Sequence, residues 1–189
     1  MLTCAKLAAN AALGSCRNGN VAISGEVIVI NFDDWQNATI TEANSVISSI
    51  VLEGQAKAYR LTSKDRAFEA SYSMNRGTYD NSLTHQVILR AFDNTQENKA
   101  AINALIHGRF VFIVKRVDIS NPETVYEVYG CQNGLTASAS DGNSTDGDGV
   151  LNATTMASDD NARESELPTS VFSTDLAATK TMIDALVTA

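Results

Sequence analysis

For most of its length the chain alternates short apolar segments with polar turns that contain glycine or asparagine, which is the pattern of strands. Residues 26–32, EVIVINF, are apolar and β-branched on both faces, which predicts a strand covered on two sides. Residues 67–74, AFEASYSM, alternate strictly, which predicts a half-buried strand. Its apolar face carries Phe68, Ala70, Tyr72 and Met74. Further strands or extended segments are predicted at 45–52, 56–61, 82–92, 109–117, 125–130, 131–140, 149–158 and 161–172, with a loop at 33–44.

One segment in mid-chain has helical spacing instead. Its stripe of apolar residues, with a capping position at Asp93 answered by Gln96 and an end at Gly108, predicts a helix over 95–107. The stripe consists of Ala101, Ile102, Leu105 and Ile106. A helix between strands is compatible with a crossover in a parallel sheet, a catalytic scaffold or a prop beside a β-sandwich. Because parallel strands need long crossovers and the chain supplies one helix, the prop is favoured.

The two ends of the chain differ from its middle. Residues 1–20 read as an arm, and residues 173–189 predict a terminal helix that Ser173 or Thr174 caps. The stripe of this helix is Leu176, Thr179, Met182, Ile183 and Leu186. Residues 21–172 therefore form one domain, an antiparallel β-sandwich or barrel with a flanking helix.

Charge narrows the classes of partner. The formal net charge of the 189 residues is −8, and residues 96–189 hold 13 acidic and 6 basic side chains. Such a chain repels a phosphate backbone, so sequence-specific binding of nucleic acid is not expected. Three cysteines, Cys4, Cys16 and Cys131, leave at least one unpaired within the chain, which favours synthesis in a reducing cytoplasm. The apolar runs are too short to span a bilayer, so no membrane anchoring is expected.

Candidate catalytic groups are few. His85 lies within a strand and His107 at a helix end, where structural roles are expected. Asp33 and Asp34 stand beside Trp35, but a turn at a strand end explains that pair without acid–base chemistry. No nucleophile elbow, phosphate loop or metalloprotease motif is present, so neither an enzyme nor a cofactor is expected.

Two charged regions are candidates for contacts instead. The loop DGNSTDGDG at 141–149 offers carboxylate oxygens, but its spacing does not match an EF-hand, and we expect an ordinary hairpin loop. Its acidic residues are Asp141, Asp146 and Asp148. A basic group can grip phosphates, but we expect either a solvated rim or a complement to acidic side chains of a neighbouring subunit. That group is Lys57, Arg60, Lys64 and Arg66, and Asp33, Asp34 and Trp35 are assigned to the same expected subunit interface.

The order of these features resembles the tail tube, or major tail, proteins of tailed bacteriophages. The resemblance covers residues 14–172 and runs from VIVINFDDW through SLTHQVILRAFDNTQENKAAINALIHGRFVFIV to YEVYGCQNGLTASAS, GVLNATTMAS and ESELPTSVF. It implies a β-sandwich with one flanking helix, assembled into hexameric rings that stack as a tube in the virion. It also implies an acidic lumen through which DNA passes without specific binding, and tape-measure and tail terminator proteins as partners.

Several readings stay open at this stage. The C-terminal helix departs from a minimal tube subunit, which leaves a neck, connector or tail terminator protein as an alternative. A carbohydrate- or receptor-binding β-sandwich would use Trp35 as an exposed stacking platform. A hydrolase would use Asp33, Asp34 and a histidine. For the tube, residues 82–92 or 26–32 are expected to be edge strands that a neighbouring subunit completes.

Overall fold

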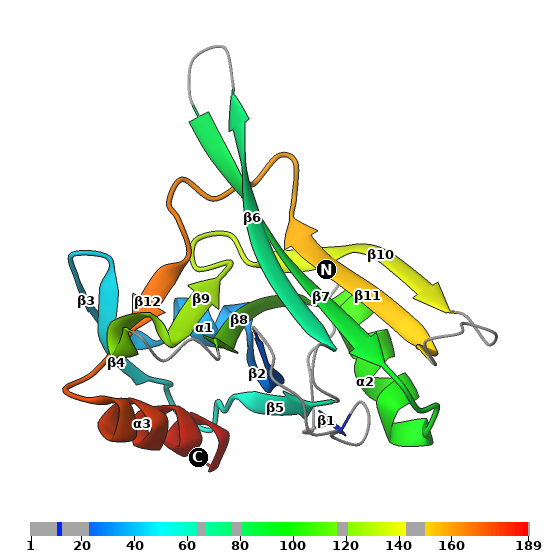
Figure 1. The fold of residues 1–189 in the computed structure, drawn as a ribbon, viewed down its shortest axis with the longest axis horizontal. Helices are drawn as coiled ribbons and strands as arrows, with labels where there is room; N and C mark the ends of the chain where they lie inside the picture. The colour runs from blue at the N-terminus through cyan, green and yellow to red at the C-terminus, as the bar shows by residue number, and fades with distance from the viewer. Residues whose placement is uncertain are drawn as a thin grey trace.

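The computed structural model describes residues 11–12, 23–63, 67–76, 81–116, 121–142 and 150–188. Within these ranges the protein is mainly β, as the sequence predicts, with twelve strands in one mixed sheet (Figure 1). The strands are β1 (Ala11–Ala12), β2 (Ile23–Asn31), β3 (Thr39–Ala43), β4 (Val46–Val51), β5 (Tyr59–Thr62), β6 (Phe68–Arg76), β7 (Asn81–Ala91), β8 (Arg109–Arg116), β9 (Tyr126–Tyr129), β10 (Leu135–Gly142), β11 (Asn152–Ser158) and β12 (Thr169–Val171). The helices are α1 (Phe32–Gln36), α2 (Gln96–His107) and α3 (Leu176–Thr188), with a 3-10 turn at Pro122–Thr124.

The sheet branches at β8. Its main path runs β3-β4-β12-β9-β8-β10-β11-β7-β6, while β2 pairs with the other edge of β8 and β5 pairs with β2. One edge of β8 is shared, because Phe112 to Lys115 pair with β9 whereas Arg109 and Phe110 pair with β10. Neighbouring strands are antiparallel except for the β12–β4 and β1–β5 pairs. The predicted sandwich or barrel is thus a single sheet that folds over itself.

Two hydrophobic clusters lie on opposite faces of β2 and β8. Val27 and Val29 belong to the first cluster, which is enclosed by strands β5, β6, β7, β10 and β11 and by α2. Ile28 and Ile30 belong to the second, which lies among β4, β9, β12, α1 and α3. The prediction of a strand covered on both sides is therefore confirmed for residues 26–31, because β2 separates two cores, while Phe32 begins α1.

Helix α2 connects β7 and β8, which are not neighbours in the sheet, so it is no crossover between paired strands. It packs Ala101 and Leu105 into the first cluster, while Ile106 is 37% exposed. Its N-cap is Thr95, whose side chain accepts a hydrogen bond from the Asn98 N–H. The cap predicted at Asp93 is wrong, because the Asp93 carboxylate binds the Asn98 side chain instead. Gly108 is the C-cap, as predicted.

Helix α3 forms where a terminal helix was predicted and covers the second cluster. Thr179, Ile183 and Leu186 of its stripe are buried. The cap differs from the prediction, since the Asp175 carboxylate, and neither Ser173 nor Thr174, accepts the Ala178 N–H at 2.7 Å. A hydrogen bond from the Ala58 N–H to the Leu186 carbonyl also joins the end of α3 to the segment before β5.

Two further expectations are wrong. Residues 33–44 are no simple loop, because they contain most of α1 and all of β3. A two-residue turn with positive φ at Asn44 and Ser45 pairs β3 with β4. The proposed edge strands at 82–92 and 26–32 are interior strands, since β7 pairs with both β6 and β11 and β2 pairs with both β5 and β8. The strand path ends instead at β3 and β6.

Candidate functional site

The β6–β7 hairpin leaves the body of the molecule and projects from it (Figure 1). The face of β6 that begins in the core at Phe68, 2% exposed, continues outward through Ala70 to Tyr72 at 50% and Met74 at 67%. The sequence predicted a half-buried strand, and this prediction holds only for the first residues of β6, from Phe68 to Ala70. The outer half of β6 carries an apolar face that no described element covers.

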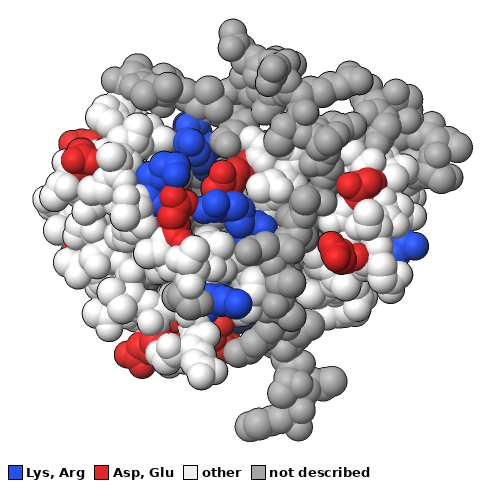
Figure 2. Space-filling view, turned by 90° about the horizontal axis from the view of Figure 1, so that it is seen from below, with Lys and Arg blue, Asp and Glu red and all other residues white. Residues whose placement is uncertain are grey.

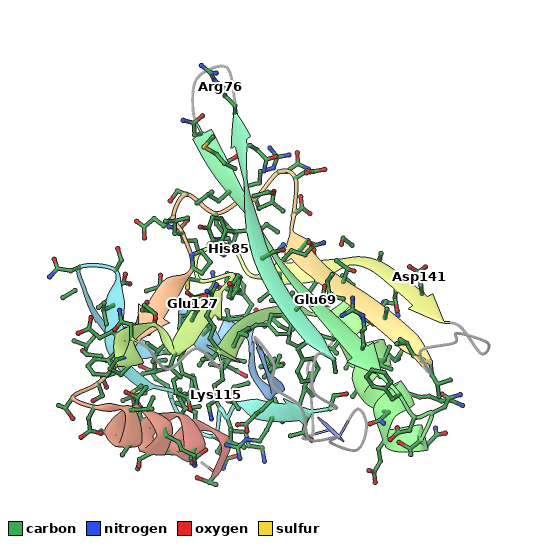
Figure 3. All side chains as sticks on the ribbon, viewed as in Figure 1. Glu69, Arg76, His85, Lys115, Glu127 and Asp141 are labelled. Carbon is green, nitrogen blue, oxygen red and sulfur yellow. The ribbon has the colours of Figure 1, made fainter. Side chains whose placement is uncertain are left out.

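Register places partners from β7 on the same face. Tyr72 lies opposite His85, and Met74 lies opposite Leu83, so these four side chains share one surface. The hairpin surface is defined here as Tyr72, Met74 and Leu83. Figure 3 shows His85 where the hairpin leaves the body and Arg76 near its tip.

The outer edge of β6 is also open within the described chain. The Arg90 N–H donates to the Ala67 carbonyl at 2.9 Å, which makes these residues a hydrogen-bonded pair. Backbone direction alternates along an antiparallel strand, so the N–H and C=O groups of Tyr72 and Met74 point away from β7. Apolar side chains and an unpaired backbone edge therefore occur on the same residues.

A cleft of about 390 Å³ lies at the base of the hairpin. Its lining mixes apolar and acidic side chains, and Leu167 at its rim is 57% exposed. The lining residues are Trp35, Ile40, Glu42, Ile47, His85, Cys131, Gln132, Glu164, Glu166, Leu167 and Thr169.

His85 forms the junction between hairpin and cleft. Its imidazole is buried, with Nδ1 3.2 Å from the Gly130 N–H and Nε2 3.0 Å from the Glu166 carbonyl. A backbone N–H can only donate and a carbonyl can only accept, so the ring is neutral with its proton on Nε2. Burial lowers the pKa of His85 to about 4, against the opposing effect of the Glu166 carbonyl. Both ring nitrogens are engaged, in agreement with the expected structural role.

The Gly130 N–H belongs to a turn, Gly130–Gly134, that interrupts an otherwise continuous strand. Tyr129 pairs with Phe112 of β8 and Leu135 pairs with Phe110, so β9 and β10 follow the same edge and the turn bulges out between them. Both glycines have positive φ, at +80° and +69°. The turn forms one wall of the cleft.

Glu164 holds this turn from the opposite side. Its carboxylate accepts the Gln132 N–H at 3.0 Å and the Asn133 N–H at 3.1 Å, although the residue is only 1% exposed. Burial raises the pKa of Glu164, and the two N–H donors oppose that rise. Its backbone also pairs with Leu83, so one residue connects the turn with the edge of β7.

Trp35 is buried at 5% exposure, and its indole N–H donates to the Cys131 carbonyl at 2.9 Å. The expectation of an exposed stacking platform is therefore wrong, because α1 turns the ring inward to the second cluster. Burial also raises the pKa of the Cys131 thiol to about 12, so the thiol is protonated at neutral pH. Cys4 and Cys16 lie outside the described residues.

The two aspartates of the sequence lie on α1. Asp34 accepts a hydrogen bond from the Asn31 side chain at 2.9 Å, and Asp33 is exposed. His85 is held by backbone groups through both nitrogens, and His107 is exposed at the end of α2. The hydrogen bonds described for Asp34 and His85 thus lead to Asn31 and to backbone groups, which does not favour the hydrolase hypothesis.

The predicted basic group is only partly described. Arg60 forms ion pairs with Glu26 and with Asp184 of α3, so its charge is compensated within the chain. Figure 2 shows acidic and basic side chains in contact on the face that carries α3 and β5. Lys57 is exposed, while Lys64 and Arg66 lie outside the described residues. An interface role for this group stays a prediction.

The predicted acidic hairpin exists as β10 and β11. Asp141 pairs with Ala153 and is exposed near the end of β10 (Figure 3). Asp146 and Asp148 lie outside the described residues. Among the residues with defined positions, no three histidine, cysteine or acidic side chains come together as a metal site. None of the helices placed by the structure is long and apolar enough to cross a bilayer.

Sequence reasoning missed Glu164 and the turn it holds. The residue sits in a polar segment whose composition gives no sign of burial, and its partners are about thirty positions away, Gln132 and Asn133. The two glycines that flank CQN were the available signal.

Searches against protein-family models, curated proteins and solved structures found no match for this chain.

Proposed function

We propose that this chain is a structural subunit that self-assembles through the β6–β7 hairpin, and that the assembly is the tail tube of a bacteriophage virion. The observation that carries the proposal is that one face of β6 is buried at its first residue and exposed, yet still apolar, further along the strand. Tyr72 and Met74 are half or more exposed on a strand whose first residue, Phe68, is buried. Exposed apolar surface of this kind marks a contact with another macromolecule, and an open strand edge favours pairing with another strand.

A second copy of the chain is the partner we propose. The strand path ends at β3 on one side and at β6 on the other, so copies related by rotation can pair unlike edges and close into a ring. The tube is supported by the order of strands and helices that resembles tail tube proteins. The net charge of −8 fits a conduit for DNA, because like charge weakens adhesion to phosphates.

Two of the alternative hypotheses have lost the observations that motivated them, whereas a neck, connector or tail terminator protein stays an alternative because α3 is present. A stacking platform needs an exposed Trp35, and the ring is buried. A hydrolase would need a histidine beside Asp33 and Asp34, and His85 binds backbone groups of Gly130 and Glu166 instead. Tape-measure and tail terminator proteins are proposed as partners of the assembled tube only.

The test compares the wild type with Met74→Asp by light scattering and negative-stain electron microscopy over a range of concentrations. We expect rings or tubes from the wild type. A carboxylate at position 74 would have to be desolvated in the contact, so association should weaken at least about tenfold, which is about 1.4 kcal/mol. The thermal unfolding midpoint should stay unchanged, because Met74 is 67% exposed in the subunit.

Ser73→Asp is the matched control. Ser73 is the neighbouring residue of the same strand, it is exposed, and it points to the opposite face. It should assemble like the wild type. Wild-type protein that stays monomeric at all concentrations and salts would refute self-assembly. Open or irregular aggregates without a tubular form would refute the tail tube while leaving the hairpin contact in place.

A further inference from the structure

His85 joins three separate parts of the chain. Its Nδ1 accepts the N–H of Gly130 in the turn, its Nε2–H donates to Glu166, and its own backbone N–H donates to Ser158 at 3.0 Å. The segment of Glu164 and Glu166 covers the edge of β7 through the paired backbone groups of Leu83 and Glu164. The imidazole therefore holds the turn and this covering segment together, beside the Glu164 carboxylate that accepts the Gln132 and Asn133 N–H groups.

An imidazolium cannot make the same contacts. It carries N–H groups on both nitrogens, so protonation sets the Nδ1–H against the Gly130 N–H, two donors 3.2 Å apart. We propose that the turn Gly130–Gly134 is an acid-operated latch, closed by neutral His85 and released when this imidazole is protonated. Release opens the cleft on the side of this turn, while the Nε2–H bond to Glu166 is kept.

The charged and titratable groups around His85 affect how readily its imidazole takes up a proton. Glu42, Glu164 and Glu166 line the same cleft and attract an imidazolium, whereas Tyr129 of β9, with its ring centre 5.5 Å away, stays neutral. Tyr72 of β6 lies opposite in the strand pair and Cys131 lies in the turn. Burial raises the pKa of Tyr129 and of Cys131 to about 12, so neither group titrates in acid.

The direction of the pH dependence follows from the sign of the shift. The pKa of His85 falls from 6.5 to about 4, so between these values the open form binds a proton that the closed form excludes. The closed latch therefore loses stability as the pH falls through this window. Glu164 has the opposite sign, because its raised pKa makes the closed form hold its proton more tightly. A release in acid is thus opposed by Glu164 and favoured by His85.

The chain carries its own reporter of the latch. Trp35 is the single tryptophan, and its indole N–H bonds the carbonyl of Cys131 in the turn. Release breaks this contact and admits water, so the emission of Trp35 should shift to the red with a midpoint between pH 6.5 and about 4, the pKa values of His85 in the open and closed forms. In a Cys4→Ser, Cys16→Ser background, Cys131 should become reactive toward a dithiodipyridine reagent over the same range.

His85→Gln is the test variant, because a glutamine amide can accept and donate but gains no proton. This variant should lose both the red shift of Trp35 emission and the gain in Cys131 reactivity in acid. His107→Gln, which alters the exposed histidine of α2, should keep both changes. In the wild type, the NMR titration of the His85 ring should coincide with the fluorescence step, which keeps the test independent of how well the variant folds.

Three results would overturn the latch. They are a fluorescence step that survives His85→Gln, the lack of any step between pH 7 and pH 3.5, and a step that coincides with loss of the far-ultraviolet circular dichroism of the strands. The last would mean that the domain unfolds as a whole. The inference rests on the contacts of His85 and does not depend on the proposed function.

Discussion

At the scale of single residues, two glycines shape the turn beside the cleft. Gly130 and Gly134 both adopt positive φ, and a Cβ at Gly134 would lie 2.6 Å from the Arg109 side chain and 2.8 Å from the Phe32 ring. The turn can therefore pack against β8 and α1 only where position 134 has no side chain. The same turn presents the N–H groups that Glu164 and His85 bind, so the geometry of the cleft depends on this glycine.

Gly134→Ala should lower the free energy of unfolding by about 2 to 4 kcal/mol, from left-handed backbone strain and overpacking together. Gly54→Ala is its control, because Gly54 also has positive φ but has nothing within 4 Å of the added methyl group. It should cost only about 1 to 2 kcal/mol. Urea denaturation measures both values, and equal losses would show that close packing of the turn contributes nothing.

At the scale of elements, the ends of the helices show how local and tertiary effects combine. Both stripes were readable from the sequence, but α2 is capped by Thr95 rather than Asp93, and α3 is capped by Asp175. Several residues before each helix have suitable capping side chains. Which of them caps depends on where the chain leaves the preceding strand or loop, so composition alone does not select it.

Asp175→Ala should destabilise the protein by about 1 kcal/mol, because the Ala178 N–H loses its acceptor. Thr174→Ala removes the residue that the sequence suggested and should change the stability by less than about 0.5 kcal/mol, as for other exposed sites. Thermal or urea unfolding of the two variants decides between the caps. A larger loss for Thr174→Ala would contradict the assignment.

At the scale of the whole molecule, acidic side chains outnumber basic ones. Several basic side chains form ion pairs, such as Arg60 with Glu26 and Asp184 and Arg116 with Glu127 at 2.8 Å. Figure 3 places Glu127 in the body of the molecule and Glu69 on the hairpin. Internal pairing leaves the excess of eight negative charges to act on the surroundings.

The protein should therefore not retard double-stranded DNA in a gel, even at about 50 mM salt, where electrostatic binding is strong. The physical reason is repulsion between the phosphates and a net charge of −8. Assembled material should behave like dissociated subunits in this assay. Retention of DNA that disappears at higher salt would reveal a basic surface and would contradict an inert conduit.

The sequence by itself determined the local elements and their buried faces. The two-sided pattern of β2, the strict alternation of β6, and the stripes of α2 and α3 all arise from neighbours within a few positions, where periodicity reports the face that turns away from water. These patterns established a mainly β fold without the structure. They also placed Tyr72 and Met74, two residues of the hairpin surface, on the same face as Phe68.

Tertiary structure decided what covers each face and edge. The pattern of residues 82–92 is that of an amphipathic strand and does not say whether the strand lies at an edge of the sheet. Pairing with β11 makes β7 an interior strand. Trp35 and Glu164 are buried through contacts with Cys131 and Gln132, far away in the chain. Such pairings depend on the path of the whole backbone. A local pattern can therefore say that Met74 is apolar and faces one way, but not that the other described residues leave this face without a cover.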